Sequence, residues 1–531
     1  MNFMKKLQDT LEDRMKLTEN GAAGFETSKS ALVDLNFAVA SLRNEQEQEI
    51  TTRFMKAFLE DRVLAMKWLF FLRDVRGGLG ERRTFRIILR YLAYHYTDMI
   101  CALTEILSEY GRYDDLLVLI DTPAEERVLS CIAAQLKEDA ANREKGQSIS
   151  LCAKWMPSIN TSSAESRSLA KKLQKSLDFT AKQYRKLLAQ LREYLKITEV
   201  YMSANRWGDI DYSAVASKAN VLYRNAFMRR DVERREAFLE KAKQGEAVMH
   251  AEVLMPHDIV AQYAPDVLYG KIKIGVIDIS LEILWNNLPD TVNEAENVLC
   301  VVDGSGSMTV PIGRTGITAL HISNALGIYF AERLKGDYHN KFITFSSRPE
   351  YVDLSKCQSL QEKLQLAFSY DDCSNTNLEA TFDLILETAV KGRLKQEELP
   401  GTVLIISDME FDAAVPEVLT GFDCSTWDAL TKAMRKGKVF EEDNRDTLFE
   451  TIRKKYQKHG YILPRLVFWN VNSRTGVIPI RENEQGVALV SGFSTHICQM
   501  VLSQELSPYK ALVKVLNNPR YKVIEKYVTV Q

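Results

Sequence analysis

Hydrophobic residues follow two different spacings along this chain, and the change comes near residue 290. Before that point, leucine, alanine and aromatic residues recur every three or four positions, with short polar or glycine breaks between the runs. This spacing puts apolar side chains on one face of a helix, so it predicts a long array of helices. The expected helices span residues 54–72, 83–96, 99–107, 114–119, 128–136, 168–177 and 181–195. The sequence has no strict period, so a repeat array is inferred from successive helical hairpins.

In the second half, short β-branched runs alternate with helical spacing, which predicts a doubly wound parallel sheet. The expected strands are 298–302, 341–345, 351–354, 402–407, 466–470 and 487–490, and the expected helices are 319–334 and 378–390. The predicted fold class is an α-helical repeat array, a horseshoe or ring, in residues 1–291, followed by a Rossmann-like α/β domain in residues 292–531. Residues 411–446 are expected to form an elaborated loop or a helical insertion beside that domain.

The first expected strand of the second half ends in a motif suited to magnesium. Asp303 follows an apolar run, and Ser305 and Ser307 place two hydroxyl groups at alternate positions after it. Mg²⁺ prefers oxygen ligands and is usually held by one or two carboxylates, with water in the remaining positions. We expect Gly304 and Gly306 to tighten this turn, because glycine tolerates left-handed dihedral angles.

Two later segments offer the ligands that this turn lacks. Thr376 precedes an expected helix, and Asp408 ends another β-branched run. Loops at the carboxyl ends of parallel strands gather at one crevice, so these residues should meet Asp303 there. A turn rich in glycine and serine is by itself usually only a turn. The three segments together predict a site for Mg²⁺, or for Mn²⁺ or Ca²⁺, formed by Asp303, Ser305, Ser307, Thr376 and Asp408.

Composition indicates an ordinary soluble protein. The chain has 531 residues, of which 46% are hydrophobic and 26% are charged, which suits about two to four globular domains. Its eight cysteines include no Cys-x-x-Cys pair, which argues against a disulfide framework or a zinc ribbon and favours a reducing cytoplasm. No stretch has the pattern of a signal-peptide core or a membrane span, so we expect a cytoplasmic protein without membrane contact. We also expect a monomer.

Positive charge is concentrated in parts of the helical half, although the formal net charge of the whole chain is −2. Residues 73–83 place arginines around a glycine turn, and arginine side chains and helix N-termini both suit phosphate oxygens. A solvated face with ion pairs to nearby acids is an equally good interpretation. Local charge density selects these candidate RNA contacts: Arg73, Arg76, Arg82, Arg83, Arg86, Arg90, Lys171, Lys172, Lys175, Lys182, Arg185 and Lys186.

Two resemblances extend this interpretation. The order Asp-x-Ser-x-Ser, threonine and aspartate at strand ends resembles the metal-ion-dependent adhesion site of von Willebrand factor A domains. A helical array followed by such a domain resembles the TROVE class, the family of the Ro autoantigen. Local blocks closely resemble an uncharacterised branch of TROVE-like proteins labelled only as a domain of unknown function, and they are residues 17–22, 73–83, 110–116, 154–158, 184–188, 407–412 and 460–470.

The TROVE resemblance implies a function in RNA binding. Ro-type proteins form a closed ring of helical repeats whose ends are joined by the A domain. Single-stranded 3′ ends of misfolded noncoding RNA enter a basic hole, and structured Y RNAs bind the outer rim. Recognition of this kind depends mostly on phosphate contacts. The resemblance therefore implies a ribonucleoprotein or RNA quality-control scaffold.

Two other function classes stay open. The metal site could capture a carboxylate from a partner protein, as it does in the adhesion family, which would make the chain a metal-dependent scaffold or adaptor without an RNA role. Catalysis is the weakest alternative, because the sequence has no Gly-x-Ser-x-Gly elbow and no Walker lysine motif. A second metal between Asp408, Glu410 and Asp412 would make catalysis of phosphodiester hydrolysis possible. We expect a binding protein rather than an enzyme.

Overall fold

The computed structural model describes residues 14–528, except 266, 269–270, 293–296, 314–315, 347, 372, 414–446, 482 and 504. Most of the expected insertion at 411–446 therefore lies outside the described residues. Within the described ranges, no helix is both long and apolar enough to cross a membrane.

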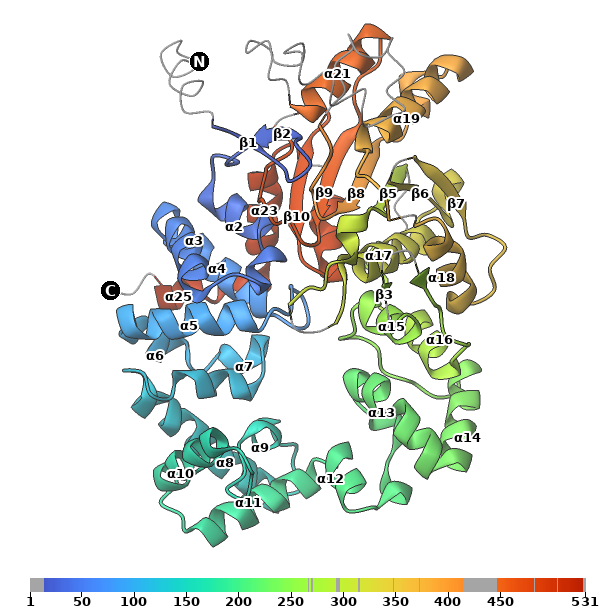
Figure 1. Ribbon diagram of the computed structural model, residues 1–531. Helices are drawn as coiled ribbons and strands as arrows, with labels where there is room; N and C mark the ends of the chain where they lie inside the picture. Colours follow the sequence, from blue (N-terminus) through green and yellow to red (C-terminus); the bar gives the residue numbers. More distant parts are fainter. Residues whose placement is uncertain are drawn as a thin grey trace.

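A six-stranded sheet forms the centre of the C-terminal half, and we call residues 298–501 the sheet domain (Figure 1). The strand order is β10-β9-β8-β5-β6-β7, and every pair is parallel except β6 with β7. The strands are β5 (Val298–Asp303), β6 (Lys341–Phe345), β7 (Glu350–Asp353), β8 (Thr402–Ser407), β9 (Arg465–Asn470) and β10 (Val487–Ser491). The predicted class, helices followed by a mostly parallel α/β sheet, is confirmed.

Helices cover both faces of this sheet. Neighbouring residues on a strand point to opposite faces, and Phe468 and Trp469 of β9 show which helices lie on each. The ring of Phe468 packs edge-on against Phe449 of α21 at 4.9 Å, and that of Trp469 against Phe330 of α17 at 5.8 Å. The helices of this domain are α17 (Ala319–Arg333), α18 (Leu360–Ser369), α19 (Leu378–Gly392), α21 (Leu448–Lys458) and α22 (Cys498–Val501).

The helical region begins beside the sheet, where α2 packs on β10. Its first limb contains α2 (Ala31–Phe37), α3 (Glu47–Glu60), α4 (Arg62–Arg73), α5 (Arg83–His95), α6 (Thr97–Leu103), α7 (Leu107–Tyr110), the 3-10 helix η2 (Tyr113–Leu119), α8 (Glu125–Glu144), α9 (Cys152–Trp155), α10 (Ala164–Ser176) and α11 (Ala181–Tyr194). The prediction of one helix over 54–72 is wrong, because Asp61 is extended and its side chain caps α4 at the N–H of Leu64. The helix predicted at 114–119 is a 3-10 helix.

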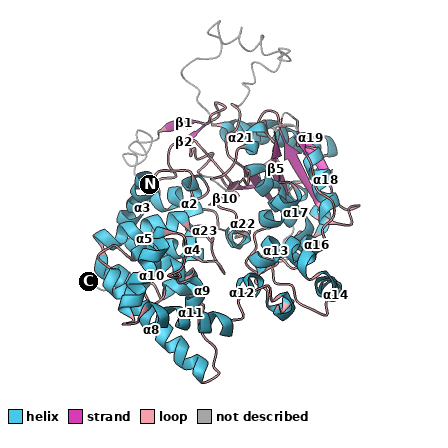
Figure 2. Cartoon of the chain, turned by 60° about the horizontal axis from the view of Figure 1, so that its bottom comes forward, coloured by secondary structure: helices cyan, strands magenta, loops and turns pink. Residues whose placement is uncertain are grey.

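The second limb returns the chain to the sheet domain. It contains α12 (Thr198–Ser203), α13 (Ser217–Arg230), α14 (Val232–Lys243), α15 (Pro256–Tyr263), the hairpin β3 (Val267–Leu268) and β4 (Lys271–Ile272), and α16 (Ile279–Asn286). Helix α15 packs on α17, and α16 packs on α18. In both views α8–α11 and α13–α14 lie on different sides of the molecule, with α12 between them (Figure 1 and Figure 2). Both ends of the helical region thus contact the sheet domain.

Each terminal segment of the described chain packs against the other part of the molecule. The N-terminal hairpin of β1 (Met15–Leu17) and β2 (Ala23–Phe25) exchanges two backbone hydrogen bonds of 2.9 Å, from Phe25 to Ile478 of the sheet domain and back. The C-terminal helices α23 (Pro508–Leu516), α24 (Pro519–Lys522) and α25 (Glu525–Val528) all pack against α4 of the helical region.

Asp74 is the centre of this C-terminal attachment. Its carboxylate is fully buried, accepts hydrogen bonds from Arg520 and from the Tyr521 hydroxyl at 2.9 Å, and also accepts the backbone N–H of Arg76 at 3.0 Å. A buried carboxylate with several donors is costly to remove, because each donor then loses its partner. Asp74 therefore joins α24 to the end of α4.

We predict that Asp74→Ala lowers the free energy of unfolding by about 2–3 kcal/mol, because Tyr521 and Arg76 lose their acceptor. Urea titration followed by circular dichroism measures this change. Asp337→Ala, at an exposed position of the sheet domain, is the control and should change stability little. Equal stability of the two variants would contradict the prediction.

Candidate functional site

The predicted metal-site residues lie at the carboxyl ends of β5 and β8. These two central strands mark the point where the strand order reverses, which is where open α/β sheets bind ligands. Asp303 is the last residue of β5, and Asp408 directly follows β8. The topology therefore places both carboxylates at one crevice, as the sequence predicts.

Ser305 and Ser307 fold back onto these two aspartates. Asp303 accepts the backbone N–H of Ser305 at 2.9 Å and the hydroxyl of Ser407 at 2.5 Å. The hydroxyl oxygens of Ser305 and Ser307 are 3.1 Å apart, and the Ser307 hydroxyl also bonds to Asp408. Two carboxylates and two hydroxyls thus converge within a few ångströms, with both aspartates fully buried.

Burial raises the pKa of Asp408, and the neighbouring carboxylates of Asp303 and Glu410 raise it further. Burial also raises the pKa of Asp303, and the hydrogen bonds that its carboxylate accepts lower this pKa in part. The described cation nearest to this pair is Arg474, whose guanidinium lies 3.5 Å from Asp408 and 2.9 Å from Glu19. A divalent cation would supply the positive charge that two buried carboxylates lack.

Thr376 is brought to the same crevice by its loop. The backbone N–H of Gly306 bonds to the carbonyl of Ser374 at 2.9 Å, and that of Asn377 bonds to Ser346 after β6. Thr376 is buried, and its hydroxyl accepts the side-chain amide of Asn20 at 3.3 Å. All five predicted metal-site residues therefore lie at one end of the sheet.

Gly304 is needed because a side chain at this position would clash with a neighbour, and not because of its backbone dihedral angles. Its φ angle lies outside the left-handed region, so that expectation from the sequence is wrong. A Cβ atom on Gly304 would lie 2.5 Å from a carboxylate oxygen of Asp371. Two neighbouring residues do take positive φ without being glycine, Met409 at 64° and Cys373 at 54°. Backbone strain of this kind gathers at functional sites.

Glu410 is a residue whose role the sequence analysis missed. Its fully buried carboxylate accepts the backbone N–H groups of Arg474 at 2.8 Å, of Thr475 at 2.9 Å and of Glu19 at 2.9 Å. These bonds tie the N-terminal segment 17–22 to the loop after β9. Because Glu410 is already saturated with donors, it is poorly suited to hold the second metal considered above.

The residue types fit a magnesium ion. Mg²⁺ is held by few carboxylates and keeps several waters, and the crevice offers two carboxylates and three hydroxyls from three loops. Asp303, Ser305, Ser307, Thr376 and Asp408 would hold the ion, which would act as a Lewis acid or as an anchor for an incoming oxygen ligand.

A second site lies between the two limbs of the helical region and the sheet domain. A cavity of about 1500 Å³ is lined by residues from both limbs and by Ile312, Gly313, Ile317 and Phe493 of the sheet domain, and we call it the central cavity. Eight cationic side chains line it, against three acidic ones. The cationic residues are Arg43, Arg73, Arg82, Arg83, Arg112, Lys154, Arg192 and Lys218, and the acidic residues are Glu81, Glu199 and Asp258.

Half of these cations form ion pairs: Arg43 with Glu81, Arg73 with Asp115, Arg112 with Asp114, and Lys218 with Asp258. In the part of the chain that the structure describes, the other four have no carboxylate partner, and we call them the basic wall: Arg82, Arg83, Lys154 and Arg192.

Two residues of the basic wall illustrate why its charge is not neutralised. Arg192 donates to the carbonyls of Ala153 and Met156 and to Ser158, which hold the guanidinium without cancelling its charge. Burial lowers the pKa of Arg82, and the neighbouring guanidinium groups of Arg112 and Arg86 lower it further, more than the carboxylates of Asp114 and Asp115 raise it. Mutually repelling cations at a cavity surface favour an anionic ligand.

The structure distributes the twelve predicted RNA contacts over several places. Only Arg73, Arg82 and Arg83 line the central cavity, and Arg73 is buried in its ion pair with Asp115. Arg76 donates to the carbonyl of Glu109, and Arg86 pairs with Asp114 and Asp115. Besides Arg76, the exposed residues outside the cavity lining are Arg90, Lys171, Lys175, Lys182, Arg185 and Lys186.

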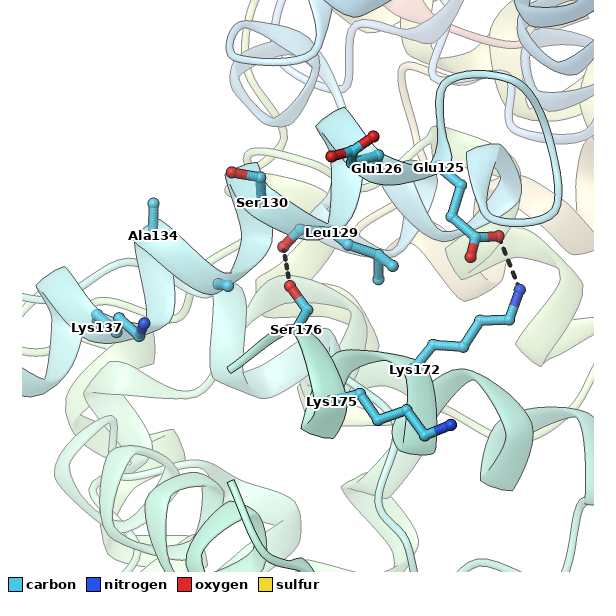
Figure 3. A pocket seen from close by; sticks show the side chains of 10 residues that line it. Glu125, Glu126, Leu129, Ser130, Ala134, Lys137, Lys172, Lys175 and Ser176 are labelled. Carbon is cyan, nitrogen blue, oxygen red and sulfur yellow. Dashed lines mark hydrogen bonds and ion pairs between the residues drawn. The ribbon is translucent and has the colours of Figure 1, made fainter. Parts of the chain in front are cut away.

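Lys172 and Lys175 line a separate groove of about 700 Å³ between α8 and α10 (Figure 3). Lys172 pairs there with Glu125 at 2.7 Å and with Asp121 at 2.5 Å. Sequence reasoning missed Arg43, Arg112, Lys154, Arg192 and Lys218 of the central cavity, because these cations are far apart in the chain and none lies in the residues chosen by charge density.

Comparison with known proteins gives relatives but no activity. Residues 297–520 match a family described as a domain of unknown function, DUF7788, and residues 124–295 match another, DUF2828. Uncharacterized protein L728 of Acanthamoeba polyphaga mimivirus is 29% identical over 543 residues, covering 94% of this chain and 87% of the viral protein. The crystal structure of the Deinococcus radiodurans Ro (RSR) protein is similar with a TM-score of 0.39 and 12% identity, over 87% of this chain and 92% of that one.

We predict that Glu410→Ala releases the N-terminal segment, because three backbone N–H groups lose their acceptor. The free energy of unfolding should fall by about 2–4 kcal/mol. Amide hydrogen exchange should accelerate at residues 17–22. Glu397→Ala, whose side chain is 77% exposed, is the control. Unchanged exchange at 17–22 in the Glu410 variant would show that this carboxylate does not hold the segment.

Proposed function

We propose that this protein binds noncoding RNA as a scaffold, with a single-stranded part of the RNA in the central cavity. The observation that carries this proposal is the basic wall, whose four cations line the cavity and form no ion pair with any carboxylate of the described residues. Backbone phosphates are the ligands that such cations attract, and the interaction releases counterions and weakens as salt rises. Recognition would then be loose in sequence, as the TROVE resemblance also implies.

The path of the chain supports a ring. Helix α2 contacts β10 at one end of the helical region, and α15 and α16 contact α17 and α18 at the other. We propose that the two limbs and the sheet domain together surround the RNA strand, and that structured parts of the RNA stay outside. A ring of this kind selects RNAs with a free single-stranded end.

We also propose that Mg²⁺ binds at Asp303, Ser305, Ser307, Thr376 and Asp408. The support is the convergence of two buried carboxylates with three hydroxyls from two loops. Water would complete the metal shell, and a carboxylate from a partner protein could replace one of these waters. The alternative function, a metal-dependent protein scaffold, therefore uses the same site.

Binding rather than catalysis is favoured by Glu410, whose carboxylate is engaged by backbone donors and is not placed to hold a second metal. A reducing compartment such as the cytoplasm is favoured by the cysteines, because the seven within the described ranges form no disulfide with one another. We propose that the protein acts there as a monomer.

For RNA binding, we predict that Arg82→Gln weakens binding of a 12-nucleotide single-stranded RNA several-fold. The slope of log affinity against log salt should fall by about 0.7, because one phosphate contact is lost. Fluorescence anisotropy over a salt series measures both quantities. Arg90→Gln is a matched control, because Arg90 lies on α5, the helix that begins directly after Arg82, is exposed and is absent from the cavity lining. Identical curves for parent and Arg82→Gln would remove Arg82 from the RNA site.

For the metal, we predict that Mg²⁺ at about 100 times its Kd raises the free energy of unfolding by about 2.7 kcal/mol. Asp303→Asn should abolish this gain without destabilising the metal-free protein, since it removes one of two buried like charges. Urea titration with and without Mg²⁺, together with calorimetric titration, tests both statements. An Asp303→Asn variant that still gains stability from Mg²⁺ would place the ion elsewhere.

A further inference from the structure

The central cavity has a second wall of a different kind. Helix α13 presents Ala219, Leu222 and Tyr223 to the cavity, at the three- and four-residue spacing of one helix face, and Val253 lies beside them. We call these four residues the apolar wall. In Figure 1 α13 lies in the second limb, whereas α5, α9 and α11, which carry the basic wall, lie in the first.

Two of the four side chains of the apolar wall are open to solvent. Leu222 is 70% exposed and Val253 is 37% exposed. A single exposed leucine needs no explanation, and Leu59 is exposed by 79% outside this cavity. Neighbouring apolar side chains that face a basic surface inside one cavity are different, because clustered apolar exposure marks binding surfaces.

Tyr223 gives this wall an aromatic ring in a fixed orientation. Its hydroxyl donates to the carboxylate of Glu199 at 3.4 Å, and its ring meets Phe227 edge-on at 6.2 Å. The ring is half-buried, so part of it faces the cavity. A ring held in this way can stack on a planar ligand without losing much conformational freedom.

The ligand that fits both walls is a single nucleic-acid strand. Each nucleotide has a charged phosphate on one side and a planar apolar base on the other. We propose that the apolar wall holds nucleobases, with Tyr223 as a stacking platform and Leu222 and Val253 as apolar contacts, while the phosphates face the basic wall. This inference rests on the proposed RNA function and adds that the bases, and not only the phosphates, are recognised.

Contacts to the bases would distinguish single strands from duplexes, which contacts to the phosphates do not. An unpaired base has two open π faces, and base–aromatic stacking tolerates any sequence. In a duplex the bases are stacked inside and only the backbone is offered. The apolar wall would therefore distinguish single strands from helices, whereas the basic wall attracts both.

The test compares two probes on the full chain. One probe is a fluorescein-labelled 12-nucleotide oligouridylate, and the other is an abasic ribose-phosphate oligomer of the same length. The double variant Leu222→Ser/Tyr223→Ser should bind oligouridylate about tenfold more weakly than the parent, with an unchanged salt slope. Its affinity for the abasic oligomer should equal that of the parent. Leu59→Ser is the matched control and should change neither affinity.

A milder variant separates a base contact from a packing defect. Tyr223→Leu keeps an apolar side chain and removes the ring, so it should lose part of the oligouridylate affinity with a melting temperature close to that of the parent. Equal oligouridylate affinity of the parent and the double variant would overturn the proposal that the apolar wall binds bases. An equal loss of affinity for both probes in the double variant would also overturn it. If the parent binds neither probe at low salt, the RNA function itself fails, which is a different result from failure of the base contact.

Discussion

The helical region is attached to the sheet domain at both of its ends, and the position of every side chain in the central cavity depends on this double attachment. At one end, α2 packs on β10 and the C-terminal helices pack on α4. At the other end, α15 and α16 pack on α17 and α18. A helical array fixed at one end only would be free to open or close, and the residues of its two limbs would have no defined separation. The sheet domain therefore holds the two limbs at a defined separation, and it also contains the residues of the candidate metal site.

Buried carboxylates with several donors fasten this arrangement at the points where distant parts of the chain meet. Asp74 joins α24 to α4, Asp115 accepts hydrogen bonds from Arg73 and Arg86, and Glu410 ties the N-terminal segment to the loop after β9. Such a group costs free energy to bury and recovers it only when its donors are in place. These acids consequently specify one arrangement of segments. The crevice of Asp303 and Asp408 differs, because Arg474 is the one cation that the described part of the chain pairs with these two carboxylates.

The sequence could predict the sheet and the meeting of Asp303 with Asp408 because both depend on local patterns. The strand at 341–345 was visible as a β-branched and aromatic run, and the ends of β5 and β8 fix where Asp303 and Asp408 lie once the sheet is parallel. The cavity could not be predicted in this way. Lys154 and Arg192 line the same cavity only because α9 and α11 fold together, and the residues around Lys154 carry no other cation. Charge density instead selected residues such as Lys182 and Lys186, which are exposed outside the cavity lining.

The metal crevice and the central cavity are separate sites, yet a short stretch of chain joins them. Ser307 bonds to Ser305 and Asp408 in the crevice, and only five residues later Ile312 lines the cavity. The next residue, Gly313, donates its backbone N–H at 2.9 Å to Asn44, which lines the same cavity from the helical region. A cation that fixes the Ser307 hydroxyl would also restrict the segment that follows it. A short stretch of chain therefore joins the candidate metal site to the surface where we propose that RNA binds.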